Sequence, residues 1–487
     1  MQQINRIRHV CALLLLLGAG FSHSQVLAQA PAPPAAPPAS TASTITPAKP
    51  APLDPAARAA KIEEYMQGHV KTNGFSGAIL LASEGKPLVS KGYGFANVEW
   101  QIPNTPQTKF RIGSITKQFT SMAVMQLREQ GKLKLEDSVC AYVAPCPDTW
   151  KAVTIHHLLT HTSGIPSYTG LADWRKVMMA PKTIDEMIGF FRDLPLQWTP
   201  GDKFAYNNSG YFLLGAVIEK ASGKKYEEVV REQIFTPLGM ADSGYDWSAT
   251  IIPHRASGYS GRPPAVRNAA PLDMQQPYAA GSLYSTTEDL LKWDQALYTD
   301  RLLPAAAKQT MWTPFRENYA YGWTIVSPSP ATFLHRRIVH TGGINGFSSI
   351  IIRLPDANVT AVVLTNNDSL PGGAGAVGRD LLAIYFGQPY TVPTPRTVAK
   401  VDPSIYDRYV GKYELRPDFI MTVTREGNSL MTQATGQGKL EVFPESETRF
   451  FPKVMEATIA FEKDAAEKVV ALVLTQGGRE QRAKKIE

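Results

Sequence analysis

Residues 110–131 read FRIGSITKQFTSMAVMQLREQG, and this stretch decides most of what we expect of the fold. Its apolar periodicity predicts a helix over residues 116–130, which Gly131 would end. If the helix begins at Ser114, Lys117 lies one turn along on the same face and can reach the serine hydroxyl. A lysine whose pKa is lowered by burial can act as the base that a serine nucleophile needs. Because Ser-x-x-Lys also occurs by chance at exposed helix starts, the motif needs partners elsewhere in the chain.

A first partner motif is Tyr206-Asn207-Asn208. The phenol of Tyr206 can relay protons if neighbouring cations lower its pKa, and the amide of Asn208 can hold both the lysine and a substrate carbonyl. The alternative explanation is an N-cap turn that opens a helix predicted over residues 211–221. This motif alone therefore does not establish a catalytic role.

A second partner motif is His340-Thr341-Gly342-Gly343, at the end of a strand predicted over residues 338–340. The two glycines would let a substrate backbone approach closely, and Thr341 can donate to a carboxylate. His340 can supply positive charge or a hydrogen bond, and the N–H of Gly343 can join that of Ser114 in an oxyanion hole. A tight hairpin turn is the alternative explanation of the glycines.

Together, in this order and spacing, the three motifs resemble those of the serine β-lactamase and DD-peptidase superfamily, nearest its class C-like branch. The flanking phrases also resemble that family: FRIG at 110–113, HLLTHTSG at 157–164 and AAGSLYS at 279–285. The resemblance covers roughly residues 70–386. It implies an α/β (α+β) β-lactamase-like sandwich, in which an antiparallel sheet and an all-helical region enclose the site.

The resemblance also implies a role for each motif residue. Ser114 matches the acylated nucleophile, and Lys117 and Tyr206 match the acid/base pair. The amides of Ser114 and Gly343 match the oxyanion hole. The residues that match substrate-binding positions are Asn208, His340, Thr341 and Gly342.

His340 departs from the class C pattern, which usually has lysine at this position. Histidine here is similar to certain DD-peptidases, D-amino-acid peptidases and esterases of the same fold. Because histidine is only partly charged near neutral pH, it would hold a substrate carboxylate less firmly. This weakens the case for an efficient β-lactamase.

The N-terminus has the order of a secretory signal peptide. Arg6 and Arg8 precede an uncharged apolar stretch, and small residues follow at Ala28 and Ala30. The apolar stretch is shorter than a typical transmembrane helix. We therefore expect cleavage after Ala28 and no stable transmembrane segment in the mature chain. The mature chain would then be periplasmic or secreted. In such an oxidising compartment Cys140 and Cys146 are expected to form a disulfide rather than stay free thiols.

Composition shifts divide the rest of the chain. We expect a signal peptide over residues 1–28, a Pro/Ala-rich linker over 29–57, the hydrolase domain over 58–390 and a second linker over 391–402. Strands predicted early, at 77–83 and 87–92, and late, at 347–353 and 360–366, indicate a sheet that combines both ends of this domain.

The last segment, residues 403–487, is predicted to be a small all-β barrel or sandwich, because short alternating segments recur there. Tyr409-Val410-Gly411-Lys412-Tyr413 is similar to the opening strand of a lipocalin-like β-domain that is appended to some hydrolases of the family.

Composition excludes some other functions. The net charge of +7 is scattered, without basic runs interleaved with aromatic residues, so we expect no nucleic-acid partner. His157 and His161 have a zinc-like spacing, but no glutamate lies between them and no third ligand is evident. We therefore expect no metal and no cofactor.

We conclude that the sequence predicts an exported serine hydrolase that cleaves an amide or ester through a Ser114 acyl-enzyme. The substrate would be a small peptide, ester or β-lactam. A D-Ala-D-Ala carboxypeptidase or D-amino-acid peptidase is favoured over a carboxylesterase and a weak class C-like β-lactamase. The alternative of another class is a sensor that penicillin acylates without turnover. The oligomeric state stays open.

Overall fold

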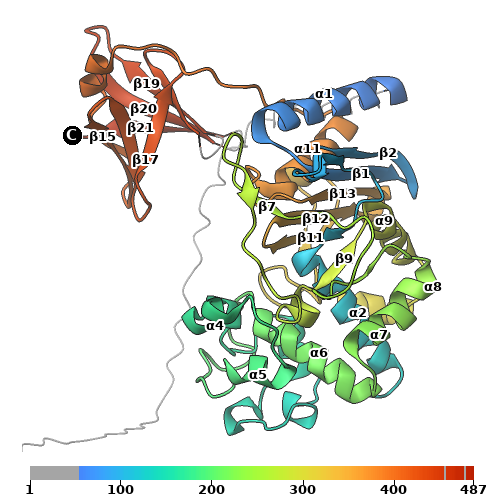
Figure 1. Ribbon diagram of the computed structural model, residues 1–487. Coiled ribbons are helices and arrows are strands. Elements are labelled where there is room, and N and C mark those ends of the chain that lie inside the picture. The colour runs from blue at the N-terminus through green and yellow to red at the C-terminus, as the bar shows by residue number, and fades with distance from the viewer. Residues whose placement is uncertain (1–53, 454–456, 477–478) are drawn as a thin grey trace, which may run out of the picture. The chain divides into compact units, whose positions relative to one another are not determined.

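A six-stranded antiparallel sheet organises the hydrolase region. The computed structural model describes residues 54–453, 457–476 and 479–487, so the predicted signal peptide and most of the first linker lie outside the described residues. The strand order is β10-β11-β12-β13-β1-β2 (Figure 1). The strands are β1 Gly77–Ser83, β2 Lys86–Tyr93, β10 Thr324–Val326, β11 Arg337–Ile344, β12 Phe347–Leu354 and β13 Val359–Thr365.

The sheet joins the two ends of the hydrolase region, as predicted. Strand β1 lies between β2 and β13, and Gly77 pairs with Thr365 across the junction. Every residue of β13 is buried, which suits an apolar strand covered on both faces. The turn between β1 and β2 uses Glu84 and Gly85, both with positive φ.

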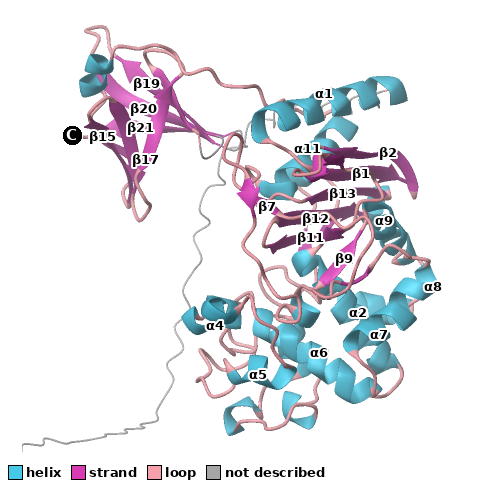
Figure 2. Cartoon of the chain, in the orientation of Figure 1, coloured by secondary structure: helices cyan, strands magenta, loops and turns pink. Residues whose placement is uncertain are grey.

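Helices cover both faces of the sheet, in a layered arrangement that Figure 2 shows by colour. Helices α1 Pro55–Asn73 and α11 Gly373–Tyr385 pack on one face, where Tyr65 and Leu381 belong to one apolar cluster with Ile79. Helices α2 Thr116–Glu129 and α9 Thr287–Ala296 pack on the other face.

The second face is also fixed by a buried ion pair. The guanidinium of Arg353 on β12 donates to Asp294 on α9 at 2.6 Å, and neither side chain is more than 1% exposed. Thr360 on β13 donates to the other oxygen of the same carboxylate at 2.7 Å.

A helical region follows α2 in the chain and packs against it. It is held locally by a disulfide between Cys140 and Cys146, whose Cα atoms are 5.3 Å apart. Its helices are α3 Ile155–Leu159, α4 Ala172–Val177, α5 Ile184–Gly189, α6 Asn208–Ser222, α7 Tyr226–Val230 and α8 Thr236–Leu238; α10 Ala305–Met311 comes later in the chain. None of the helices in the described part of the chain is long and apolar enough to cross a membrane.

Several element boundaries differ from the predictions. Helix α6 begins at Asn208 rather than Tyr211, because Asn207 caps it by accepting from the N–H of Gly210. Helix α7 passes at Val230 into a π-turn, Arg231–Phe235, which leads directly into α8. Strand β11 continues past His340 to Ile344.

The C-terminal segment is a closed eight-stranded antiparallel barrel, which resolves the predicted choice between barrel and sandwich. Strand β14 closes the ring by pairing with β21, as Tyr413 does with Lys485. The strands are β14 Gly411–Arg416, β15 Phe419–Glu426, β16 Ser429–Ala434, β17 Leu440–Pro444, β18 Arg449–Pro452, β19 Ala457–Lys463, β20 Val469–Gln476 and β21 Arg479–Lys485.

Candidate active site

Ser114 lies in a tight turn that precedes α2, not in the helix itself. Gly113–Ile115 forms a 3-10 turn, and α2 begins at Thr116. Gly113 has a φ of 50°, a conformation that side chains disfavour, and a Cβ there would lie 3.0 Å from the nitrogen of Gly343. The serine is therefore presented by a backbone turn that only glycine fits, next to strand β11.

Lys117 is fully buried and surrounded by three oxygen atoms. Its Nζ lies 3.0 Å from Ser114 Oγ, 2.9 Å from Asn208 Oδ1 and 2.9 Å from the carbonyl oxygen of Ala280. Burial holds the pKa of Lys117 well below its ordinary value. Burial thus favours the neutral amine, which can donate to Asn208 and Ala280 and accept the Ser114 hydroxyl proton.

Tyr206 and Asn208 complete this wall of the site. Lys117 Nζ lies 4.8 Å from the centre of the Tyr206 ring. Burial raises the pKa of the Tyr206 phenol, and a hydrogen bond with Ser114 lowers it in part, although the residue as a whole is 42% exposed. The amide nitrogen of Asn208 donates to Thr169 Oγ1 at 3.1 Å, so one of its two N–H groups remains for a substrate.

The position of Tyr206 depends on His161, which the sequence analysis named only within a flanking phrase and for its zinc-like spacing from His157. His161 Nδ1 accepts from the N–H of Asn207 at 3.1 Å, and its carbonyl oxygen accepts from the N–H of Ala205 at 3.0 Å. These two bonds hold the backbone on either side of Tyr206, whose ring centre lies 4.4 Å from that of His161. His161 has a φ of 58° and is 1% exposed, so this arrangement is built into the core.

The three neighbouring histidines do not converge on one point. His161 lies beyond the end of α3, so it does not share a helix face with His157. His157 Nδ1 accepts from the N–H of Thr154 at 3.2 Å, and His156 Nδ1 lies 2.7 Å from the hydroxyl of Tyr321. Within residues 54–453, 457–476 and 479–487, no group of three or more His, Cys, Asp or Glu side chains is placed to hold a metal.

The opposite wall is strand β11, where His340 turns inward. His340 is 5% exposed, its Nε2 lies 2.9 Å from the hydroxyl of Tyr319, and its Nδ1 lies 2.6 Å from the carbonyl oxygen of Thr341. Burial, with the nearby Lys117, lowers the pKa of His340 to about 3. A pKa this low favours the neutral ring at physiological pH and so disfavours one of the two roles expected from the sequence, the supply of positive charge.

The two glycines of this motif have different roles, and neither forms a hairpin turn. The turn to β12 lies at residues 345–346. A Cβ on Gly342 would lie 2.0 Å from the carbonyl oxygen of Ile112, so Gly342 lets β11 pack closely against the nucleophile turn. Gly343 and Thr341 are exposed, and a Cβ on Gly343 would meet nothing within 4 Å.

The site therefore brings together every motif residue that the sequence proposed, but on two unequal walls. The wall on α2 and α6 carries the serine, the lysine, the phenol and the amide. The wall on β11 contributes the main chain of Gly343 beside Gly113 and the exposed side chain of Thr341. Such an arrangement can activate a serine hydroxyl and stabilise an oxyanion with main-chain N–H groups.

Comparison with known proteins agrees with this arrangement. A family model described as Beta-lactamase matches residues 59–384, and one described as a domain of unknown function matches residues 395–485. A penicillin-binding protein of Bacillus subtilis (strain 168) is 33% identical over 436 residues, which cover 84% of this chain and 94% of that protein.

Two solved structures extend the comparison. The octameric penicillin-binding protein homologue from Pyrococcus abyssi has a TM-score of 0.61 and 27% identity, and the match covers 88% of this chain and 100% of that one. The D-amino acid amidase from Ochrobactrum anthropi shares the fold, with a TM-score of 0.59 and 24% identity over 67% of this chain and 98% of that one. From the family model, the relative and the caged Lys117 beside Ser114, we conclude that the chain belongs to the serine β-lactamase and penicillin-binding-protein family of serine hydrolases, with a C-terminal β-barrel appended.

Proposed function

We propose that this chain hydrolyses the amide or ester bond of a small D-amino-acid derivative through an acyl-enzyme on Ser114. The observation that carries the proposal is the cage around Lys117, in which two oxygens accept from the amine and the third belongs to the Ser114 hydroxyl. A neutral lysine held in this way has one free electron pair, and it is directed at the nucleophile.

Acylation begins when Ser114 Oγ attacks the substrate carbonyl and its proton passes to Lys117 Nζ. The N–H groups of Ser114 and Gly343 stabilise the oxyanion, and one such donor is typically worth about 10²–10³ in rate. Tyr206 keeps its proton because burial raises its pKa, so it donates to the leaving nitrogen or oxygen and is reprotonated from Lys117. Water then attacks the acyl ester, gives its proton to the same pair, and releases the acid and Ser114.

The neutral state of His340 bears on the substrate class. An anionic carboxylate gains most from a charged partner, and His340 offers none because both ring nitrogens are engaged inside the protein. This favours a D-amino-acid amide or peptide over a substrate that is held by a terminal carboxylate, such as D-Ala-D-Ala or a β-lactam. The same observation favours a carboxylesterase as the second candidate, since simple esters carry no carboxylate.

A relative supports the use of penicillin as a probe of this site. The 33% identical protein of Bacillus subtilis is named as a penicillin-binding protein. We therefore expect the site to accept penicillin slowly and to turn over neutral D-amino-acid amides or short esters faster.

The test compares the wild type with Ser114→Ala on three probes: D-alanine amide, a short-chain ester and benzylpenicillin. Turnover of the amide or the ester by the wild type alone supports the proposal and separates peptidase from esterase. A Ser114-dependent penicillin adduct without turnover of any probe would assign the chain to the sensor class instead. Turnover retained in Ser114→Ala would overturn the mechanism.

We further infer that the chain acts outside the cytoplasm. The Cys140–Cys146 disulfide supports this, because disulfides persist in oxidising compartments. The intact mass of the protein recovered from the medium or periplasm should correspond to cleavage after Ala28. A full-length mass, or recovery only from the cytoplasm, would contradict the inference.

A further inference from the structure

The interior of the C-terminal barrel is filled at one end and hollow at the other. The filled end holds a cluster of aromatic side chains, all at most 5% exposed, whose ring centres lie 4.3–5.7 Å apart. These residues are Tyr406, Tyr409, Tyr413, Phe450 and Phe461. Side chains can therefore fill the interior of a barrel of this size.

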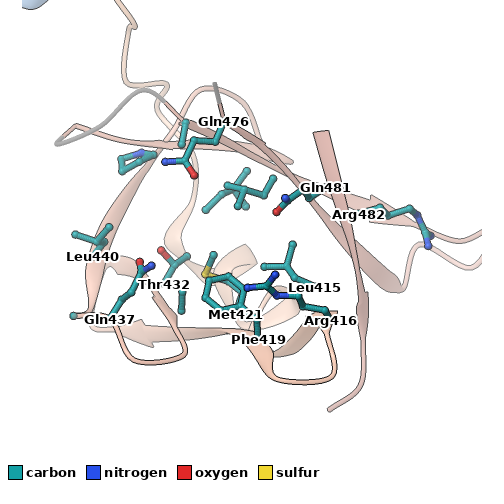
Figure 3. A pocket seen from close by; sticks show the side chains of 16 residues that line it. Leu415, Arg416, Phe419, Met421, Thr432, Gln437, Leu440, Gln476, Gln481 and Arg482 are labelled. Carbon is teal, nitrogen blue, oxygen red and sulfur yellow. The ribbon is translucent and has the colours of Figure 1, made fainter. Parts of the chain in front are cut away.

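At the other end a cavity of about 640 Å³ lies between the same strands (Figure 3). Its wall includes the inward-facing apolar residues Met421, Ala434, Ala457 and Ile459. Protein cores rarely leave voids larger than a water molecule, and small-molecule sites have volumes of about 300–1,000 Å³. The hollow end therefore has the size of a ligand site rather than of a packing defect.

A buried hydroxyl separates this cavity from an ordinary apolar core. Thr432 lines the cavity on β16 and is 4% exposed. Its hydroxyl is a polar group on the cavity wall that a bound molecule can contact.

The rim of the cavity carries a cation. The guanidinium of Arg416 lies 5.3 Å from the centre of the Phe419 ring, and Figure 3 shows both side chains on the same side of the lumen. Its contact with Asp418 is 3.5 Å long and exposed, which leaves the charge available to an anion. Arg482 also borders the cavity, but its side chain is paired with Glu462 at 2.8 Å.

We propose that the barrel binds an aliphatic carboxylate, with the apolar chain in the lumen between Met421 and Ile459 and the carboxylate at Arg416. The wall supplies apolar contact for a chain, and the rim supplies one cation for an anionic end. This site is separate from Ser114 and does not depend on the proposed hydrolase activity.

The experiment titrates the full chain with dodecanoate and with the uncharged dodecanol, by calorimetry and by NMR of ¹³C-methyl methionine. We expect saturable one-to-one binding of dodecanoate. The signal of Met421 should shift, while that of Met431, which alternates to the outer side of the neighbouring strand, should not.

Three variants locate the site. Ala434→Trp should fill the lumen and abolish binding, and Arg416→Gln should weaken dodecanoate about tenfold without affecting dodecanol. The matched control is Arg449→Gln, which removes an exposed arginine that pairs with Glu445 at 2.9 Å and does not line the cavity. It should bind like the wild type.

Absence of saturable binding, or binding that leaves the Met421 signal in place, would overturn the proposal. Equal affinity for dodecanoate and dodecanol would overturn the assignment of the carboxylate to Arg416. If Ala434→Trp does not fold, as judged by circular dichroism, Arg416→Gln and the Met421 signal still decide between these outcomes.

Discussion

Lys117 on α2 and His340 on β11 are both basic side chains buried beside one nucleophile, and loss of water lowers the pKa of both. Their surroundings give the neutral forms opposite uses. Lys117 donates to Asn208 and Ala280, and its contact with Ser114 Oγ is the one through which the neutral amine can take the hydroxyl proton. His340 forms a hydrogen bond with the hydroxyl of Tyr319 through Nε2 and with the carbonyl oxygen of Thr341 through Nδ1. Burial thus makes a base of the lysine and a packing residue of the histidine.

The largest effect is expected from Lys117→Met, which keeps the length of the side chain and removes the amine that acts as the base. We expect kcat to fall by about 10⁴-fold or more, as when one member of a nucleophile–base unit is lost. The measurement is steady-state kcat on whichever probe the wild type turns over. Lys91→Met, at an exposed lysine that pairs with Glu63, is the matched control and should keep wild-type activity.

The next test separates the two glycines of β11. In Gly342→Ala the new Cβ would meet the carbonyl oxygen of Ile112 at 2.0 Å, so the strand must move away from the Ser114 turn. Misplacing the Gly343 donor should reduce kcat by about 10²–10³-fold. In Gly343→Ala the Cβ enters open space, so the unfolding temperature should stay close to that of the wild type. Equal losses of thermal stability in the two variants would contradict their different roles.

A third test asks whether His340 carries charge. Burial lowers the pKa of His340 to about 3, so the histidine is expected to stay neutral above that pH. Activity requires neutral Lys117, so it should fall as decreasing pH protonates the lysine. A plot of kcat/KM against pH should therefore contain no titration near the ordinary histidine pKa of about 6.5 that disappears when His340 is replaced. His340→Gln should retain the profile and change kcat/KM by about fivefold or less. Loss of an acidic limb in this variant would show that the histidine is charged during turnover.

The smallest effect is expected from Tyr319→Phe. This change removes the hydroxyl that lies 2.9 Å from His340 Nε2 and leaves a buried ring nitrogen without its partner. The free energy of unfolding should fall by about 1–3 kcal/mol, while kcat changes by less than about twofold. Chemical denaturation beside kinetics checks both values. A large loss of kcat at unchanged stability would mean that Tyr319 takes part in the reaction.

Sequence reasoning predicted the lysine wall well because its signals are local. The spacing of Ser114 and Lys117 and the cap formed by Asn207 are set within one or two helical turns. It predicted the β11 wall less well, because the strand was expected to end at His340. Alternation of sides was the available signal: Ile338, His340 and Gly342 share the buried face of β11, whereas Thr341 and Gly343 share the exposed one.

The contacts that no local pattern could predict join distant segments. His161 holds the backbone around Tyr206, and Ala280 supplies an acceptor to Lys117. Both residues lie in phrases that resemble the family, but their roles depend on the folded path of the chain.

The pairing of β1 with β13 has a consequence for the order in which the molecule can fold. Gly77 is synthesised early and its partner Thr365 late, so during synthesis the first two strands exist without the third. A two-stranded hairpin is marginal on its own, and contacts between such distant segments are slow to form. The nucleophile turn, which rests on β11 of the same sheet, therefore becomes ordered only when most of the chain has been made. A nascent chain interrupted before residue 359 would carry every residue of the lysine wall and still be inactive.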